Sequence, residues 1–161
     1  MRSRLFTVAA LVALLMLSAT PVAFARPAAN GPVTLSILVT YTEMGSHGPF
    51  TADAVVCSYG DTVDLETEVI LGVDPPFMNP DYRHGATVLR VQKQFTCADN
   101  TGTFTLDFIG TYHWDQARNH GEWKVVQGTG DYENLKGHGT FAVRMGENPT
   151  LEIWQGHMQL P

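Results

Sequence analysis

The sequence predicts an all-β protein, a single antiparallel eight-stranded barrel. Apolar and polar residues alternate along most of the chain, turn residues recur roughly every 8 to 14 residues, and no helix longer than one turn is indicated. An antiparallel sandwich would show the same signature. We favour the barrel because eight strands enclose an interior just large enough for packed side chains or one small ligand.

Residues 1–25 are predicted to be an export signal. Arg2 and Arg4 form a basic start, and an apolar run follows that ends in a small-x-small cleavage pattern. The run is shorter than the about 20 apolar residues that a membrane span needs, and no later segment has the character of a span. Cleavage near Ala25–Arg26 leaves residues 26–161 as a single secreted domain.

The exported domain is acidic. The whole chain has 16 acidic and 10 basic residues and a net charge of −6. Loss of Arg2 and Arg4 with the signal leaves eight basic against sixteen acidic residues, a balance of −8. This sign disfavours a nucleic-acid partner, and the acidity by itself is sufficient to keep a secreted protein in solution.

Two cysteines, Cys57 and Cys97, are present in the chain. An even number of cysteines in an exported protein favours one disulfide bond between them. The alternatives are a pair of free thiols or half of a metal site, but two cysteines this far apart lack the CxxC spacing of a zinc knuckle.

The first half of the exported domain predicts three strands. Residues 33–44 alternate, a turn cluster follows at 45–49, and residues 50–59 form the second strand. Residues 63–71 suit a third strand, although their acid-rich start also suits a short helix. Three prolines exclude regular pairing over most of residues 72–85. This segment is either a binding loop over an opening or a cap on one end of the barrel.

The middle of the chain predicts a hairpin. Residues 86–97 and 103–114 are strands, joined by a loop at 98–102 with a glycine near its end. Residues 115–121 then predict a polar turn. One face of the second hairpin strand is expected to carry its large apolar side chains, Phe104, Leu106, Phe108, Tyr112 and Trp114.

The stretch from Trp123 to Phe141 is rich in glycine, and we interpret it as strand, glycine corner, short turn, glycine corner, strand. Glycine adopts positive φ without strain and lets another backbone approach closely, which suits a tightly curled sheet. A phosphate cradle is the rival, but Gly137–Gly139 lacks the lysine and hydroxyl of a P-loop. Residues 139–145 and 151–160 are the last two strands.

Three parts of the sequence carry a family resemblance: Phe95–Phe104, the Trp123-x-Val125 pair, and the GTGxYxxLxGxG run from Gly128 to Gly139. Together they resemble small exported bacterial proteins with an allene oxide cyclase-like barrel, a calycin-like architecture. Plant dirigent proteins are similar in fold and glycine pattern. The resemblance covers roughly residues 33–160.

The resemblance implies an eight-stranded barrel whose lumen holds an apolar or polyene-like small molecule. In characterised relatives that lumen steers a ring closure or a radical coupling. Barrels of this kind often assemble as dimers or trimers, so a homo-oligomer is a possible state of this chain. No catalytic residue is carried over, because the relatives' catalytic residues do not match this sequence position by position.

The best candidates for ligand binding are Tyr41, Glu43, Tyr112 and Trp114, which are aromatic or acidic residues on predicted strands. A few polar groups in an apolar pocket would orient a small molecule, and ring closure needs orientation more than a nucleophile. The alternative is that these side chains are ordinary core or rim residues. The catalytic residues, if there are any, stay unassigned.

Histidines do not predict a metal site. His113, Asp115, His120 and Glu122 lie close together in the sequence but match neither HxH nor HExxH spacing, so a polar turn is the simpler interpretation.

His138 and His157 lie singly in predicted strands. Each is expected to be a satisfied barrel residue and not a ligand. No GxSxG nucleophile elbow is present. We therefore predict neither a metal nor an organic cofactor.

Three functional hypotheses follow. The first is a secreted barrel that binds a small apolar molecule in its lumen. The second is a cofactor-independent cyclase or isomerase of the allene oxide cyclase-like type, so whether the protein is an enzyme stays open. The third is an extracellular interaction protein whose barrel is filled by its own side chains. A filled barrel would exclude the first two hypotheses, and polar groups converging on one point would favour the second over the first.

Overall fold

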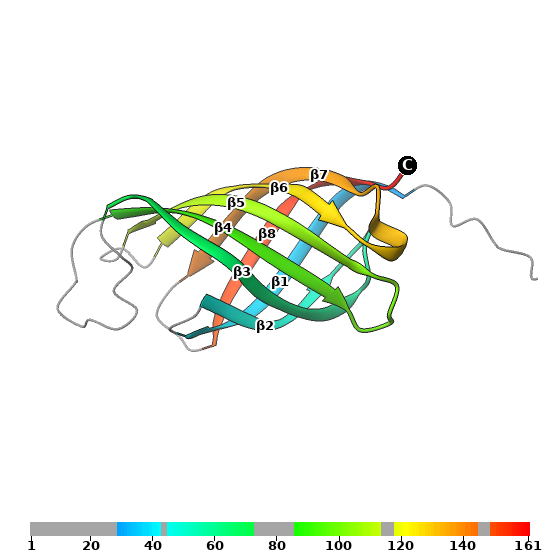
Figure 1. Ribbon diagram of the computed structural model, residues 1–161, viewed down its shortest axis with the longest axis horizontal. Coiled ribbons are helices and arrows are strands. Elements are labelled where there is room, and N and C mark those ends of the chain that lie inside the picture. Colours follow the sequence, from blue (N-terminus) through cyan, green and yellow to red (C-terminus); the bar gives the residue numbers. More distant parts are fainter. Residues whose placement is uncertain (1–28, 43–44, 73–85, 114–117, 145–148) are drawn as a thin grey trace, which may run out of the picture.

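A computed structural model describes residues 29–42, 45–72, 86–113, 118–144 and 149–161 (Figure 1). The predicted export signal, the candidates Glu43 and Trp114, and all but the first residue of the segment 72–85 lie outside the described residues. Within the described ranges, no helix is long and apolar enough to cross a bilayer.

Eight antiparallel strands close into one barrel, as predicted, and the structure shows that they follow one another around it in sequence order (Figure 1). Among the described residues, one short 3-10 helix, η1, lies between β6 and β7 in the glycine-rich stretch. The elements are β1 (Asn30–Thr42), β2 (Gly45–Ala52), β3 (Tyr59–Leu71), β4 (Ala86–Cys97), β5 (Thr103–His113), β6 (Arg118–Gly128), η1 (Gly130–Tyr132), β7 (Lys136–Arg144) and β8 (Thr150–Gln159).

The two ends of the barrel differ in chemistry. β1 closes the barrel against β8, with Leu35 opposite Trp154 and Val39 opposite Thr150. Because all neighbours are antiparallel, β1, β3, β5 and β7 finish at one end, which we call the polar end. The even-numbered strands finish at the other end, which we call the aromatic end because most of the aromatic core lies toward it.

The aromatic core fills the barrel from the aromatic end to its middle. Phe95 stacks on Phe104 with ring centroids 4.7 Å apart, and Phe108 meets Trp154 edge to face at 4.8 Å. Interlocked rings of this kind leave little free volume, and each is at most 3% exposed. The rings that contact one another are Phe50, Phe95, Phe104, Phe108, Tyr132, Phe141 and Trp154.

Several predicted boundaries are wrong. The expected turn at residues 45–49 belongs to β2, and the expected polar turn at 115–121 gives way to β6 from Arg118 onward. The alternative of a short helix at 63–71 is wrong, because that segment is part of β3. Gly48 explains the first error: a Cβ there would lie 1.9 Å from the carbonyl oxygen of Leu38, so glycine permits close strand approach and not a turn.

The glycine-rich stretch was also only partly predicted. η1 is the expected single turn, but Gly137 and Gly139 lie inside β7 and not in a second corner. Gly139 faces Gly156 across the sheet, and a Cβ on either would come within 2.6 Å of the Trp123 ring. The two glycines therefore make room for an indole that packs flat against the sheet.

The predicted Cys57–Cys97 disulfide is present. Its cysteines are 40 residues apart in the sequence and both are buried. The bond joins the connection between β2 and β3 to the last residue of β4, at the aromatic end.

Candidate functional site

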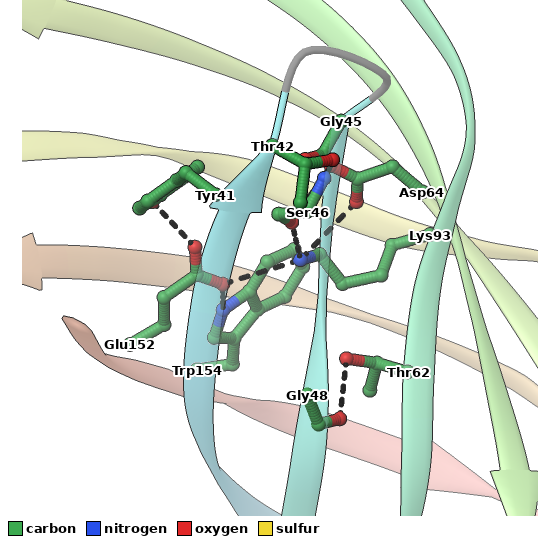
Figure 2. Close-up of polar contacts among 10 residues, drawn as sticks. All are labelled: Tyr41, Thr42, Gly45, Ser46, Gly48, Thr62, Asp64, Lys93, Glu152 and Trp154. Atoms are coloured by element: carbon green, nitrogen blue, oxygen red, sulfur yellow. Dashed lines mark hydrogen bonds and ion pairs between the residues drawn. The ribbon is translucent and has the colours of Figure 1, made fainter. Parts of the chain in front are cut away.

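The centre of the candidate site is Lys93, a lysine with no exposed surface. It occupies an inward position on β4 between Val91 and Phe95, both of which are buried. Lysine is almost never fully buried unless it is paired. Figure 2 shows its ammonium group between two carboxylates, those of Asp64 and Glu152.

On one side, Lys93 meets Asp64 of β3 and Ser46 of β2. The Lys93 Nζ lies 3.2 Å from Asp64 Oδ1 and donates a 2.8 Å hydrogen bond to Ser46 Oγ. Ser46 in turn donates from its backbone N (2.8 Å) and its hydroxyl (2.7 Å) to Asp64 Oδ2. Three strands are thus joined through one carboxylate.

On the other side, Glu152 of β8 faces the lysine. Its Oε2 lies 3.6 Å from Lys93 Nζ and accepts a 3.0 Å hydrogen bond from the indole Nε1 of Trp154. Its Oε1 accepts a 3.0 Å hydrogen bond from the hydroxyl of Tyr41 (Figure 2). We call Tyr41, Ser46, Asp64, Lys93, Glu152 and Trp154 the Lys93 cluster.

The electrostatics of the cluster follow from burial and from an excess of carboxylates. Burial acts to lower the pKa of Lys93, but the nearby carboxylates of Glu152 and Asp64 outweigh it, and the net pKa is raised. The lysine therefore stays charged. One ammonium group faces two carboxylates, so the surplus charge of the ionised cluster is negative.

The same carboxylates act on two tyrosines. Burial and then the charge of Glu152 raise the pKa of Tyr41 far above its ordinary value. Burial is also the main cause that raises the pKa of Tyr112, followed by the charges of Glu152 and Asp64. Both phenols therefore stay neutral, and Tyr41 donates its hydrogen bond to Glu152. Tyr41 is half-buried, whereas Ser46, Lys93, Glu152 and Trp154 are buried.

Asn119 adds an inward donor at the same end of the barrel. Its side chain is 2% exposed, and its Oδ1 accepts a 2.9 Å hydrogen bond from the backbone N of His113. Its Nδ2 is buried and has no hydrogen-bond partner among the described residues. Asn119 pairs with Tyr112 on β5 and with Val143 on β7, both buried. Its side chain therefore points into the barrel with theirs.

One row of paired residues links Asn119 to Glu152. Asn119 is opposite Val143, and Val143 is opposite Glu152. Neighbouring strands lie about 4.7–4.9 Å apart, so the two functional groups are separated by roughly 10 Å across the polar end. A small molecule of modest length spans that distance.

Of the four candidates named from the sequence, the structure describes Tyr41 and Tyr112. It places both at the polar end, where the charge of Glu152 acts on each. Glu43 and Trp114 lie outside the described residues.

Sequence reasoning missed Lys93, Asp64, Glu152 and Asn119. A signal for two of them was present. Lys93 is in phase with the apolar inward positions of its strand, and Glu152 is in phase with Trp154. A charged residue in an inward phase is the pattern that predicts a buried polar site. Asn119 carried no such signal, because its segment had been assigned to a turn.

A second charged group lies outside the barrel. Arg90 donates two 2.9 Å hydrogen bonds to the carboxylate of Asp107, which lowers the pKa of that carboxyl group. A shallow hollow beside it on the outer face is lined by Glu66, Glu68, Arg90 and Gln92. Arg90 is half-exposed, so this group is a surface ion pair. It buries less charge than the Lys93 cluster does.

Comparison of the chain with protein-family models, with curated proteins and with solved structures finds no match. The functional argument therefore depends on the residues of the chain itself.

Proposed function

We propose that this protein is an exported barrel that binds a small molecule at its polar end, against the Lys93 cluster. The observation that carries the proposal is the fully buried Lys93 between the carboxylates of Asp64 and Glu152. A buried ion pair stabilises a fold little better than apolar side chains of the same volume would. Clusters of this kind are enriched at functional sites.

The site narrows the chemistry of the ligand. The aromatic rings occupy the other half of the lumen, so a wholly apolar molecule deep in the barrel is disfavoured. At the polar end the surplus negative charge and the Tyr41–Glu152 pair suit a ligand that presents a hydrogen-bond donor or a positive charge. The unpartnered Nδ2 of Asn119 suits an acceptor on the same ligand. The ligand we propose is therefore amphiphilic.

Two further observations support the proposal. The Cys57–Cys97 disulfide is typical of proteins that fold in an oxidising, extracytoplasmic compartment. The resemblance of Phe95–Phe104 and of the glycine run to allene oxide cyclase-like barrels supports a small-molecule ligand, and we keep that family assignment as a proposal.

Native mass spectrometry of the mature protein tests the proposal, using protein from the producing organism's culture fluid and after exposure to organic extracts of that culture. We expect a bound mass that is absent after denaturation. Tyr41→Phe and Asn119→Ala should each reduce the affinity for the bound molecule about tenfold, because each removes a buried hydrogen-bonding partner. Their matched controls, Tyr59→Phe and Asn134→Ala, change exposed residues and should retain it.

Catalysis is the second candidate, favoured by the convergence of Lys93, Glu152 and Tyr41 on one point. A neutral phenol hydrogen-bonded to a carboxylate, with an ammonium group 3.6 Å from that carboxylate, can move protons during a ring closure or isomerisation without a cofactor. Incubation of the protein with the uncyclised precursor of the bound molecule separates the two roles. Conversion marks an isomerase, and unchanged binding marks a carrier.

The filled aromatic half favours the third hypothesis, an extracellular interaction protein. A bare protein mass in every extract, or a bound mass that the Tyr41→Phe and Asn119→Ala variants retain fully, would contradict ligand binding at the polar end. An interaction role would then be the better account.

A further inference from the structure

We propose that His138 and His157 form a two-histidine site for a divalent transition-metal ion on the outer face of the barrel. His138 lies on β7 and His157 on β8, and the two are direct partners in the antiparallel register. Both are exposed. Their neighbours Gly139 and Gly156 face inward, against Trp123, so the two imidazoles project outward from the same face of the sheet.

Taken singly, each histidine was expected to be a barrel residue and not a ligand, and both do lie in barrel strands. Neither imidazole has a hydrogen bond or ion pair among the described residues. Directly opposed residues of an antiparallel pair have Cβ atoms about 4.5–5.5 Å apart. A metal ion binds an imidazole nitrogen at about 2.0–2.1 Å. Two opposed imidazoles can therefore reach one ion without any change in the backbone.

The neighbouring residues are compatible with a cation at this position. Lys124 of β6 is the other partner of His138, but its ammonium group lies 3.7 Å from Asp107 Oδ2 and is partly neutralised there. Pro32 of β1 is the other partner of His157 and carries no charge. The row across the four strands therefore contains one paired cation and the two histidines.

The ligand set defines the class of ion. Among the described residues no three His, Cys, Asp and Glu side chains are placed to hold a metal together, so water would complete the coordination of an ion bound by this pair. Imidazole is a good ligand for copper, nickel and zinc, whereas calcium and magnesium prefer oxygen ligands. Copper(II) binds most tightly in this series, so we expect Cu²⁺ to have the highest affinity for the two imidazoles.

The site is independent of the Lys93 cluster. His138 lies near the start of β7 and His157 near the end of β8, so both belong to the aromatic end. An ion bound there would cross-link the two strands in the folded protein alone, and it would raise the stability of the fold by mass action.

Calorimetric titration of the mature, tag-free protein with CuCl2 tests the proposal. We expect one ion per chain, and an electron paramagnetic resonance spectrum with two equivalent nitrogen ligands. His138→Gln and His157→Gln should each weaken binding at least about tenfold, because the second imidazole acts at a high effective concentration. A matched control variant replaces His47 and His120, which are exposed but face no histidine, with Gln. It should bind as the natural chain does.

Thermal unfolding gives a second readout. CuCl2 should raise the unfolding midpoint of the natural chain and of the control variant. The rise should be smaller for each of the two single variants. Circular dichroism checks that all variants keep the β spectrum. Equal copper affinity in the natural chain and in the His138→Gln and His157→Gln variants would overturn the proposal. So would an equal loss of affinity in the control.

Discussion

The hydroxyl of Tyr41 donates a 3.0 Å hydrogen bond to Oε1 of Glu152, 111 residues further along the chain. The paired register of β1 and β8 ends at Val39 and Thr150, so this bond extends the contact between the first and last strands beyond their ladder. Because Trp154 holds the other oxygen of Glu152, the carboxylate is fixed in orientation at the polar end.

Replacement of Tyr41 by Phe removes one donor to a buried carboxylate. Hydrogen bonds to charged groups contribute roughly 1.5–3 kcal/mol, and Tyr41 is half-buried, so we expect a loss of about 1–2 kcal/mol in the free energy of unfolding. Urea denaturation measures it. The exposed Tyr59→Phe variant is the matched control. Equal stabilities of the two variants would mean that the bond to Glu152 contributes nothing.

Replacement of Lys93 by Met leaves Asp64 and Glu152 buried without their cation. Removal of one partner from a buried pair costs about 3–5 kcal/mol, so we expect the variant to be marginally folded at neutral pH. Addition of Asp64→Asn and Glu152→Gln should restore part of the loss, since no buried charge then remains.

The exposed lysine provides the control for that series. Lys124 is 63% exposed and its ion pair with Asp107 is long, so Lys124→Met should change the unfolding free energy by less than about 0.5 kcal/mol. The raised pKa of Lys93 predicts how stability depends on pH. The contribution of Lys93 to the free energy of unfolding is fully present below the lysine pKa of about 10.4 in the unfolded chain, and it is lost as the pH rises through the folded pKa. A lysine effect that vanished between pH 7 and pH 9 would contradict this.

Tyr41 and Tyr112 should stay protonated in the folded protein at alkaline pH, because the pKa of each is raised. Tyrosine in the unfolded chain ionises near pH 10, so stability should fall as the pH rises above about 10. Phenolate absorbance tests this with a Tyr41→Phe/Tyr112→Phe variant. The two folded proteins should give equal alkaline steps, whereas in urea the natural chain should give a step larger by two phenolates. A larger step already in the folded natural chain would refute the prediction.

Replacement of Cys57 and Cys97 by Ser should lower the unfolding free energy by about 2–4 kcal/mol. The bond closes a loop with a sequence separation of 40 residues and restricts the unfolded chain. Chemical denaturation measures the loss. Non-reducing mass spectrometry should show the natural chain two hydrogens lighter than its reduced form, and a full pair of alkylatable thiols would contradict the bond.

Gly139→Ala should destabilise the barrel by about 1–3 kcal/mol. The new Cβ would lie 2.1 Å from the carbonyl oxygen of Gln155 and 2.6 Å from the Trp123 ring, so both the neighbouring strand and the indole must move. Gly31→Ala is the control, because no atom lies within 4 Å of a Cβ built there. Thermal unfolding compares the two variants, and similar midpoints would contradict the prediction by showing that the strand and the indole adjust at little cost.

Alternation along the chain predicted an antiparallel all-β fold, the number of strands favoured a barrel over a sandwich, and the even number of cysteines favoured the Cys57–Cys97 bond. Alternation also predicted that Phe104, Leu106, Phe108 and Tyr112 share one face, and all four are buried. Errors fell on polar or glycine-rich segments that nevertheless pair as strands, such as residues 45–49. A glycine signals freedom of the backbone, but the sequence does not say whether the freedom serves a turn or a close approach.

The candidate site was recovered only in part. Tyr41 and Tyr112 were selected because they are aromatic residues on strands, yet the groups that set their chemistry, Lys93 and Glu152, were not. Each of those charges carried only a local signal, its inward phase on its own strand. Their significance arises from their meeting, which depends on the register of strands far apart in the chain.

The sequence by itself therefore determined the class of fold and the covalent cross-link. Strand periodicity and the number of cysteines can both be seen in the chain without knowledge of which strands pair. Only the tertiary structure decided which end of the barrel is polar, that Lys93 lies between Asp64 and Glu152, and that His138 faces His157. The physical reason is that barrel closure and register bring distant positions together. A shift of one residue in that pairing would turn each side chain to the opposite face.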